Sequence, residues 1–140
     1  MTTLGLQHVL VLSDDIDATR DFYRDVVGLA DGARPPLEFP GYWLYADAVP
    51  CMHVAERASY RAHAARIGLA VPTASAGAGG VDHVAFAAEG YETVLARLER
   101  LGIDVVPNTV PGVQRQLFIE DPNGVKLELN FATKEISRTR

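Results

Sequence analysis

The chain has 140 residues, of which 48% are hydrophobic and 22% charged, the balance of a globular protein rather than a disordered or fibrous one. Its formal charge of −5 excludes a basic surface for binding a nucleic-acid backbone. The single cysteine, Cys51, excludes an internal disulfide and a multi-cysteine zinc site. Because the sequence has neither an export signal nor an apolar run of the ~20 residues that a membrane span needs, we expect a cytoplasmic protein with neither nucleic acid nor a membrane as partner.

The first half of the chain reads as a strand, a helix and a pair of strands. Residues 6–13 are rich in β-branched and aliphatic side chains, which is typical of a strand. Apolar residues then recur at helical spacing over residues 17–27, and Gly28 follows as a stop signal. The apolar runs 42–47 and 50–55 predict two further strands joined as a hairpin.

The second half repeats this order. Residues 81–87 predict a strand, and residues 91–101 carry a clear amphipathic stripe that predicts a helix. A hairpin follows over 116–120 and 125–131, because residues 121–124 (Asp-Pro-Asn-Gly) have proline and glycine where a tight turn needs them. We therefore expect one domain built from two modules, residues 4–57 and 80–131.

Between the modules lies a long linker, residues 58–79, which is rich in alanine, glycine and arginine. Segments of this length are usually functional, so the linker is expected to be a lid, a dimer arm or a partly helical crossover. His63 falls within it and has no counterpart in the second half, so we expect it to be solvated. Residues 132–140 form a tail.

Four metal-capable side chains occupy corresponding positions of the two modules. His8 and His83 are 75 residues apart, and so are His53 and Glu128. Within each half, 45 residues separate the two members. A single stray histidine would not produce this pattern, so the spacing indicates an internal duplication that carries a metal site.

Strand alternation gives these four residues a common face. Their immediate neighbours are mostly apolar and are expected to pack under the helices, which turns the four polar side chains to the opposite face of the sheet. Residues two positions away share this face, as do nearby aromatic side chains. The expected substrate pocket is lined by Leu10, Trp43, Tyr45, Cys51, Phe118, Lys126 and Asn130.

Three segments, HVLVLSDDIDATRDFYRDVVGL, VDHVAF and FIEDPNGVKLELNF, resemble the vicinal oxygen chelate superfamily. This superfamily includes glyoxalase I, extradiol dioxygenases, fosfomycin-resistance transferases, methylmalonyl-CoA epimerase and bleomycin-resistance proteins. The resemblance implies an α+β fold of two βαβββ modules, which form a curved mixed sheet around a central cavity with helices on the outer face. It also implies a divalent metal, a small-molecule substrate and a homodimer.

By position, His8, His83 and Glu128 match the family's metal ligands, and His53 matches a further position that glyoxalase I fills with an acidic ligand and base. Such a donor set suits iron, manganese, zinc, nickel or cobalt. If His53 is a fourth ligand, two coordination positions stay open and redox-neutral chemistry is favoured. If His53 stays free, a catechol and dioxygen fit, with His53 as acid or base.

The leading hypothesis is a glyoxalase-like, redox-neutral lyase or isomerase with His53 and Glu128 as catalytic residues. His53 stands where a redox-neutral member has a ligand, and Phe118 lacks a hydroxyl that the dioxygenases use. The alternatives are an extradiol-type ring-cleaving dioxygenase and, third, an antibiotic-binding resistance protein without catalysis.

Overall fold

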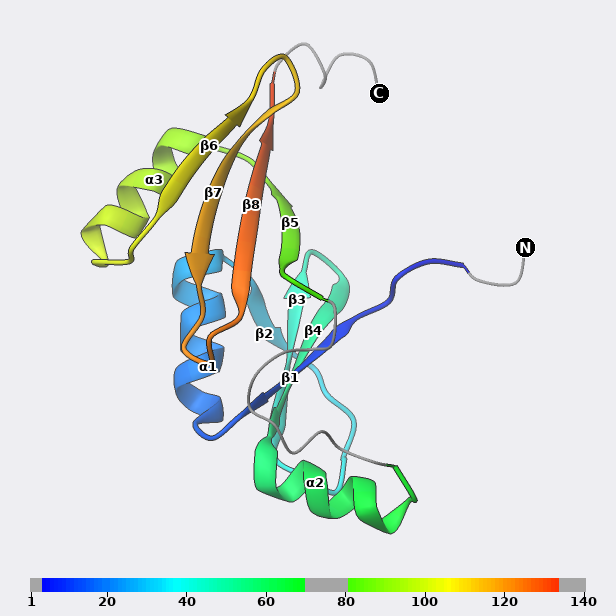
Figure 1. The fold of residues 1–140 in the computed structure, drawn as a ribbon. Coiled ribbons are helices and arrows are strands. Elements are labelled where there is room, and N and C mark those ends of the chain that lie inside the picture. Colours follow the sequence, from blue (N-terminus) through cyan, green and yellow to red (C-terminus); the bar gives the residue numbers. More distant parts are fainter. Residues whose placement is uncertain (1–3, 70–80, 134–140) are drawn as a thin grey trace. The chain divides into compact units, whose positions relative to one another are not determined.

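The computed structural model describes residues 4–69 and 81–133, and the chain divides into two compact units, residues 1–75 and 76–140 (Figure 1). We call these units the first and the second module. The first module contains β1 (Val9–Ser13), α1 (Ile16–Phe22), the π-helical segment η1 (Tyr23–Val27), β2 (Ala30–Gly32), β3 (Gly41–Ala46), β4 (Val49–Glu56) and α2 (Arg57–Arg66). The second contains β5 (Val84–Ala88), α3 (Tyr91–Arg100), β6 (Val106–Val110), β7 (Gln114–Glu120) and β8 (Lys126–Ala132).

Each module has its own four-stranded mixed sheet, in the order β1-β4-β3-β2 in the first and β5-β8-β7-β6 in the second. The strand that begins each module runs parallel to its neighbour, whereas the other pairs are antiparallel. The α+β class and the two βαβββ modules are thus confirmed. The joining of both sheets around one central cavity stays a prediction.

The strand registers of the two modules coincide. In the first module His53 lies opposite Leu10 on one side and Trp43 on the other. In the second module Glu128 lies between Ala85 and Phe118. Each of these pairs follows from its counterpart by the same 75-residue offset that relates the metal-capable residues, so the duplication extends to the hydrogen-bonding register of the sheet.

Helix α1 starts and stops at residues suited to those places. The side chain of Asp15 accepts a hydrogen bond from the backbone nitrogen of Ala18 at 3.0 Å, which caps the helix. The helical stretch ends at Gly28, whose φ of 93° is accessible to glycine at little cost. The expected helix 17–27 is therefore present, with its last five residues in the π-helical segment η1.

The core of each module lies on the helix-covered face of its sheet. Met52 and Val54 are fully buried on β4, while His53 between them is half-buried and faces the other way. Leu127 and Leu129 flank Glu128 on β8 in the same manner. The predicted alternation is confirmed.

Two strands, β2 and β6, were not expected from the residues themselves. All three residues of β2 are exposed, and β6 contains a proline and an exposed Val106. Both lie at sheet edges and form because β3 and β7 offer them backbone hydrogen bonds, not because they bury apolar side chains.

Part of the expected linker is helical, since α2 spans Arg57–Arg66. Residues 70–79 of the linker and the tail from residue 134 lie outside the described residues. Within residues 4–69 and 81–133, no helix is long and apolar enough to cross a membrane.

Candidate metal and substrate site

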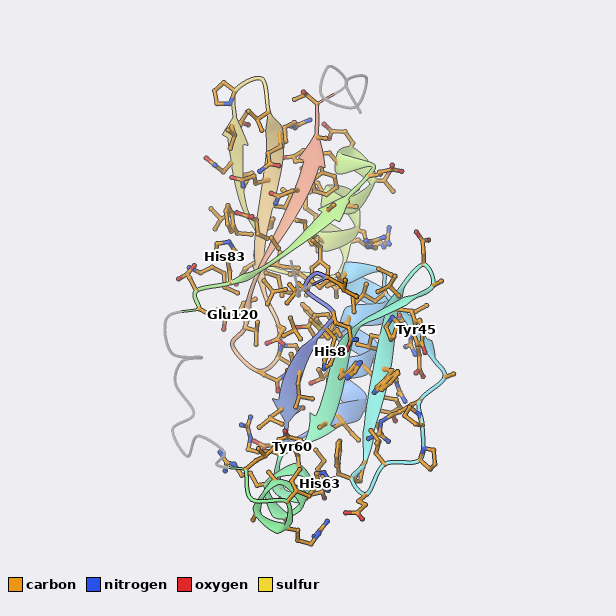
Figure 2. The ribbon with its side chains drawn as sticks, turned by 90° about the vertical axis from the view of Figure 1, so that its right-hand side faces the viewer. His8, Tyr45, Tyr60, His63, His83 and Glu120 are labelled. Atoms are coloured by element: carbon orange, nitrogen blue, oxygen red, sulfur yellow. The ribbon has the colours of Figure 1, made fainter. Side chains whose placement is uncertain are left out.

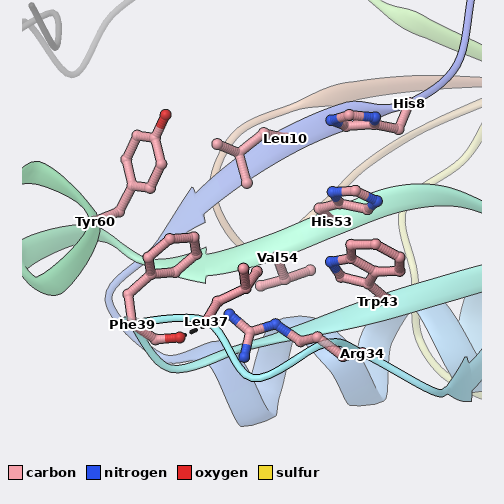
Figure 3. A pocket seen from close by; sticks show the side chains of 9 residues that line it. All are labelled: His8, Leu10, Arg34, Leu37, Phe39, Trp43, His53, Val54 and Tyr60. Carbon is pink, nitrogen blue, oxygen red and sulfur yellow. Dashed lines mark hydrogen bonds between the residues drawn. The ribbon is translucent and has the colours of Figure 1, made fainter. Parts of the chain in front are cut away.

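Three aromatic rings form a stack in the first module (Figure 3). His8 directly precedes β1, and His53 lies in the middle of β4. Their ring centroids are 3.8 Å apart with the planes 14° from parallel. Trp43 on β3 covers the other face of His53 at 4.2 Å and 7°. His53 is thus held between Trp43 and His8.

This stack constrains metal binding by the first module. A nitrogen lone pair lies in the plane of its imidazole ring, so two stacked and nearly parallel rings do not aim at one ion. In the orientation observed, either His8 or His53 can bind a given ion, and binding by both requires one ring to turn. His8 is the more exposed of the two.

The donors of the second module are closer to a chelating geometry. His83 directly precedes β5, and its Nε2 lies 3.7 Å from Oε2 of Glu128 on β8. Metal–ligand distances of ~2.0–2.2 Å allow two ligand atoms of one ion to lie up to about 4.2 Å apart. The separation of His83 Nε2 and Glu128 Oε2 is therefore compatible with binding of the same ion.

For His8 and His83, the histidines that directly precede β1 and β5, the preceding residue orients the ring. Gln7 Oε1 lies 2.9 Å from Nδ1 of His8, and Asp82 Oδ2 lies 2.9 Å from Nδ1 of His83. Because a carboxylate can only accept, Nδ1 of His83 carries the proton and Nε2 presents its lone pair. The His83 hydrogen bond, followed by that of Lys126, lowers the pKa of Asp82 and keeps it ionised.

Sequence reasoning missed this pair of supporting residues. The signal was available, because Gln7 and Asp82 are themselves 75 residues apart. Both modules therefore repeat the histidine together with the group that orients it.

Amide side chains hold Glu128 in place. Nε2 of Gln116 donates to Oε1 at 3.0 Å, and Nδ2 of Asn130 donates to Oε2 at 2.9 Å. Gln116 also donates to Asn130 Oδ1 at 3.1 Å and accepts from Asn108 at 2.6 Å, although it is only 7% exposed. The corresponding positions of the first module are Gly41 and Ala55. There His53 is held by stacked rings instead of amides.

A cavity of about 190 Å³ opens beside the ring stack, entirely within the first module (Figure 3). His8, His53 and Trp43 lie at one end of it, and Phe39 and Tyr60 at the other. Its full lining is His8, Leu10, Arg34, Leu37, Phe39, Trp43, His53, Val54 and Tyr60.

Two of the four pocket residues expected in the first module, Leu10 and Trp43, line this cavity. Tyr45 and Cys51 share their sheet face but are engaged elsewhere. The hydroxyl of Tyr45 donates to the carbonyl of Ala33 at 2.6 Å, and the Cys51 thiol lies 3.9 Å from the carbonyl of Leu44.

The three residues expected in the second module lie around its donor pair. The edge of Phe118 meets His83 at 6.5 Å, and Asn130 binds Glu128 as described. Lys126 instead forms an ion pair with Asp82 at 3.0 Å. Asn130 therefore acts on Glu128 directly, whereas Lys126 acts on His83 only through Asp82.

His63 is not solvated as expected. Its side chain is 22% exposed, and Nδ1 lies 3.1 Å from Oε2 of Glu38. His63 lies on α2 (Figure 2). Its ring centroid is 5.1 Å from that of Phe39. The expectation failed because Glu38 comes from the segment between β2 and β3, a contact that sequence order does not reveal.

The environment of His53 favours its neutral form. Burial lowers the pKa of His53, the neighbouring charges of His8 and Arg34 act in the same direction, and a hydrogen bond to the backbone of Pro50 opposes them. A neutral imidazole can either bind a metal or accept a proton.

The four metal-capable residues are thus brought together as two pairs, one in each module. Within the described part of the chain, no group of three or more His, Cys, Asp or Glu side chains stands ready to hold an ion. The donor chemistry, three imidazoles and one carboxylate, nevertheless fits a divalent transition metal. That both pairs bind one ion stays a prediction.

Duplicated βαβββ modules with nitrogen and oxygen donors at matching strand positions define a class of two-module α+β proteins built to hold a small ligand. The chain belongs to the Glyoxalase/Bleomycin resistance protein/Dioxygenase superfamily, whose family model matches residues 5–129. This is the vicinal oxygen chelate superfamily that its motifs resemble.

One protein of similar sequence and two solved structures are described here as relatives of this chain. The chain is 31% identical over 133 residues to Glyoxylase I 4 from Arabidopsis thaliana, an alignment that covers 89% of this chain and 69% of the relative. The lactoylglutathione lyase of Agrobacterium tumefaciens has a similar structure, with a TM-score of 0.63, 23% identity, and 94% and 96% of the two chains covered. The fosfomycin resistance protein FosX from Listeria monocytogenes, complexed with Mn(II) and 1S,2S-dihydroxypropylphosphonic acid, has a TM-score of 0.66, 16% identity, and coverage of 99% and 100%. Both structures share the fold.

Proposed function

We propose that this protein is a divalent-metal-dependent enzyme of the glyoxalase type, which chelates two adjacent oxygens of a small substrate and catalyses a redox-neutral lyase or isomerase reaction. The observation that carries the proposal is the duplicated donor arrangement, in which His8 and His83 each have Nδ1 tied to the preceding residue. The glyoxalase and lactoylglutathione lyase relatives support the reaction class. The metal, one of iron, manganese, zinc, nickel or cobalt, would be held by His8, His83 and Glu128, with His53 as a fourth ligand that also carries the proton.

When bound, the metal supplies a Lewis acid for the two substrate oxygens. The chain's own residues supply the proton transfer. The neutral ring of His53 has one nitrogen near the backbone of Pro50, so its other nitrogen is available to accept a proton from a substrate carbon and return it to the neighbouring carbon. Trp43 and His8 hold that ring by stacking, which lowers the entropic cost of positioning the base.

The second candidate is a ring-cleaving dioxygenase. The observation that favours it is the ring stack, because a His53 that does not coordinate together with His8 leaves a further position open for dioxygen. In that reaction His53 would again serve as acid or base.

Metal content tests the proposed ligand set. His83→Ala and Glu128→Ala are each expected to abolish stoichiometric metal in the purified protein, as measured by elemental analysis, while circular dichroism shows a folded chain. His63→Ala is the matched control, because this histidine pairs with Glu38 within the first module and is not one of the expected ligands. An unchanged metal content per chain in either ligand variant would refute the proposal.

Activity separates the two chemistries. A glyoxalase-type enzyme should convert hemithioacetals of methylglyoxal under strict exclusion of oxygen, and His53→Ala should lower turnover. Oxygen consumption coupled to a yellow ring-cleavage product from a catechol would promote the second candidate. A protein that binds such compounds and turns over neither would be a binding protein.

A further inference from the structure

The cavity of the first module contains an arginine that pairs with no carboxylate of residues 4–69 or 81–133. Arg34 belongs to the segment between β2 and β3, and its guanidinium lies between the ring stack and Phe39 (Figure 3). Nη2 donates to the carbonyl of Phe39 at 2.6 Å. Nε is buried and has no acceptor among the described residues.

Most of the other arginines of this module pair with a carboxylate. Four of them form ion pairs at 2.8–3.1 Å with a nearby carboxylate, namely Arg20 with Asp21, Arg24 with Asp25, Arg57 with Asp14, and Arg66 with Glu38. For Arg34 the structure shows one backbone carbonyl and the face of the Phe39 ring, 5.3 Å away. Its positive charge therefore lies at the cavity with no carboxylate of the described residues beside it.

A partly buried charge without a counter-ion destabilises a protein, so its presence calls for an explanation. Burial lowers the pKa of Arg34, yet a guanidinium stays charged in any protein. Its planar array of N–H donors matches the geometry of carboxylates and phosphonates. A bound oxyanion would satisfy both the charge and the unused donors.

The remaining walls indicate what that oxyanion is attached to. Leu10, Leu37, Phe39 and Trp43 present apolar or aromatic surface around the guanidinium. Such a combination of apolar walls with a single charged group is typical of small-molecule sites in which the charge fixes orientation. His8 and His53 at the same cavity place the reacting end of the molecule beside them.

We propose that Arg34 binds an anionic group of the substrate, which is therefore a small molecule with a carboxylate or phosphonate on an apolar body. This inference rests on the proposed function in taking the cavity as the substrate's place. Arg34 is then a specificity-determining residue that orients the substrate toward His8 and His53.

Trp43 makes the inference testable without turnover, because it is the chain's single tryptophan and lines the cavity. Its fluorescence is titrated with phenylacetate, with the neutral phenylacetamide of similar shape, and with phenylphosphonate. The wild-type protein should bind phenylacetate or phenylphosphonate at least about tenfold more tightly than the amide. The tighter of the two anions identifies the preferred oxyanion.

Arg34→Gln should reduce this preference to less than about twofold, and Arg34→Lys should keep part of it because the charge remains. Arg24→Gln is the matched control, since the same substitution removes an exposed arginine of η1 and should leave the preference intact. Thermal unfolding of each variant confirms that it is folded. Equal affinity of the wild type for acid and amide, or an unchanged preference in Arg34→Gln, would overturn the inference.

A turnover assay distinguishes failure of this inference from failure of the proposed function. The substrates are hemithioacetals of methylglyoxal with 3-mercaptopropionate and with 3-mercaptopropionamide. If neither hemithioacetal is converted but the protein binds the anions more tightly than the amide, the anion site is supported and the glyoxalase function is refuted. If both hemithioacetals are converted equally and the anions bind no more tightly than the amide, the glyoxalase function is supported and the role of Arg34 is refuted.

Discussion

Replacing Gln116 by leucine tests whether the amide side chains around Glu128 stabilise the fold and orient that carboxylate for metal binding. The substitution removes the hydrogen bond at 3.0 Å to Oε1 of Glu128 and those shared with Asn130 and Asn108. A hydrogen bond to a charged group is worth ~1.5–3 kcal/mol, and the two asparagines can turn toward water. We expect the free energy of unfolding of the metal-free protein to fall by about 2–3 kcal/mol.

The same substitution should weaken metal binding. Among the described residues, Glu128 would keep one hydrogen bond, from Asn130. Removal of a group that orients a ligand typically costs ~10–100-fold in metal affinity. Calorimetric titration of the chelator-treated protein with Ni²⁺ or Zn²⁺ gives the affinity, and urea unfolding gives the stability.

Gln114→Leu is the matched control, because Gln114 lies two residues earlier on β7, on the same face, and makes no described contact with Glu128. It should change neither quantity by a comparable amount. The reasoning is refuted if Gln116→Leu binds metal as tightly as the wild type, or if both leucine variants lose affinity equally.

Three further predictions concern stability and assembly. Leu127→Ala, at a fully buried position of β8, should cost ~2–5 kcal/mol in urea unfolding, whereas Leu101→Ala, at a 45% exposed position, should cost less than about 0.5 kcal/mol. Hydrogen bonds from His63 and Arg66 lower the pKa of Glu38, so its carboxylate stabilises the fold above its usual pKa of 4.5 and this contribution is lost as the pH falls. Glu38→Gln should therefore flatten the decline of Tm in acid, and an unchanged acid profile would contradict the assignment. The open edge strands β2 and β6 favour a homodimer, which light scattering at micromolar concentration should detect, and a monomer there would refute it.

The sequence predicted those features of the fold that depend on local pattern or on the repeat. Alternation placed His53 and Glu128 opposite the core, and the 75-residue offset anticipated a register that the structure repeats strand by strand. The residue pattern by itself did not predict β2 and β6, which only the family resemblance implied, because edge strands are stabilised by backbone pairing and need no apolar pattern of their own.

The candidate site could be predicted only at the level of donors. Gln116 reaches Glu128 across two strands, and its role follows from a register that residue types alone do not specify. The stack of Trp43, His53 and His8 depends on side-chain rotamers, and the isolation of Arg34 depends on which carboxylates lie within reach. These are tertiary contacts between segments distant in the chain.

The two modules hold corresponding donors by unlike forces, and this difference has a mechanical consequence. Hydrogen bonds to both oxygens of Glu128 are directional, so they fix the orientation of that carboxylate within the second module. Stacking keeps the ring of His53 between two flat neighbours but tolerates sliding and in-plane rotation, so His53 can make small adjustments within the first module. Changes of specificity during divergence of this protein should therefore accumulate around His53, while the surroundings of Glu128 stay as they are.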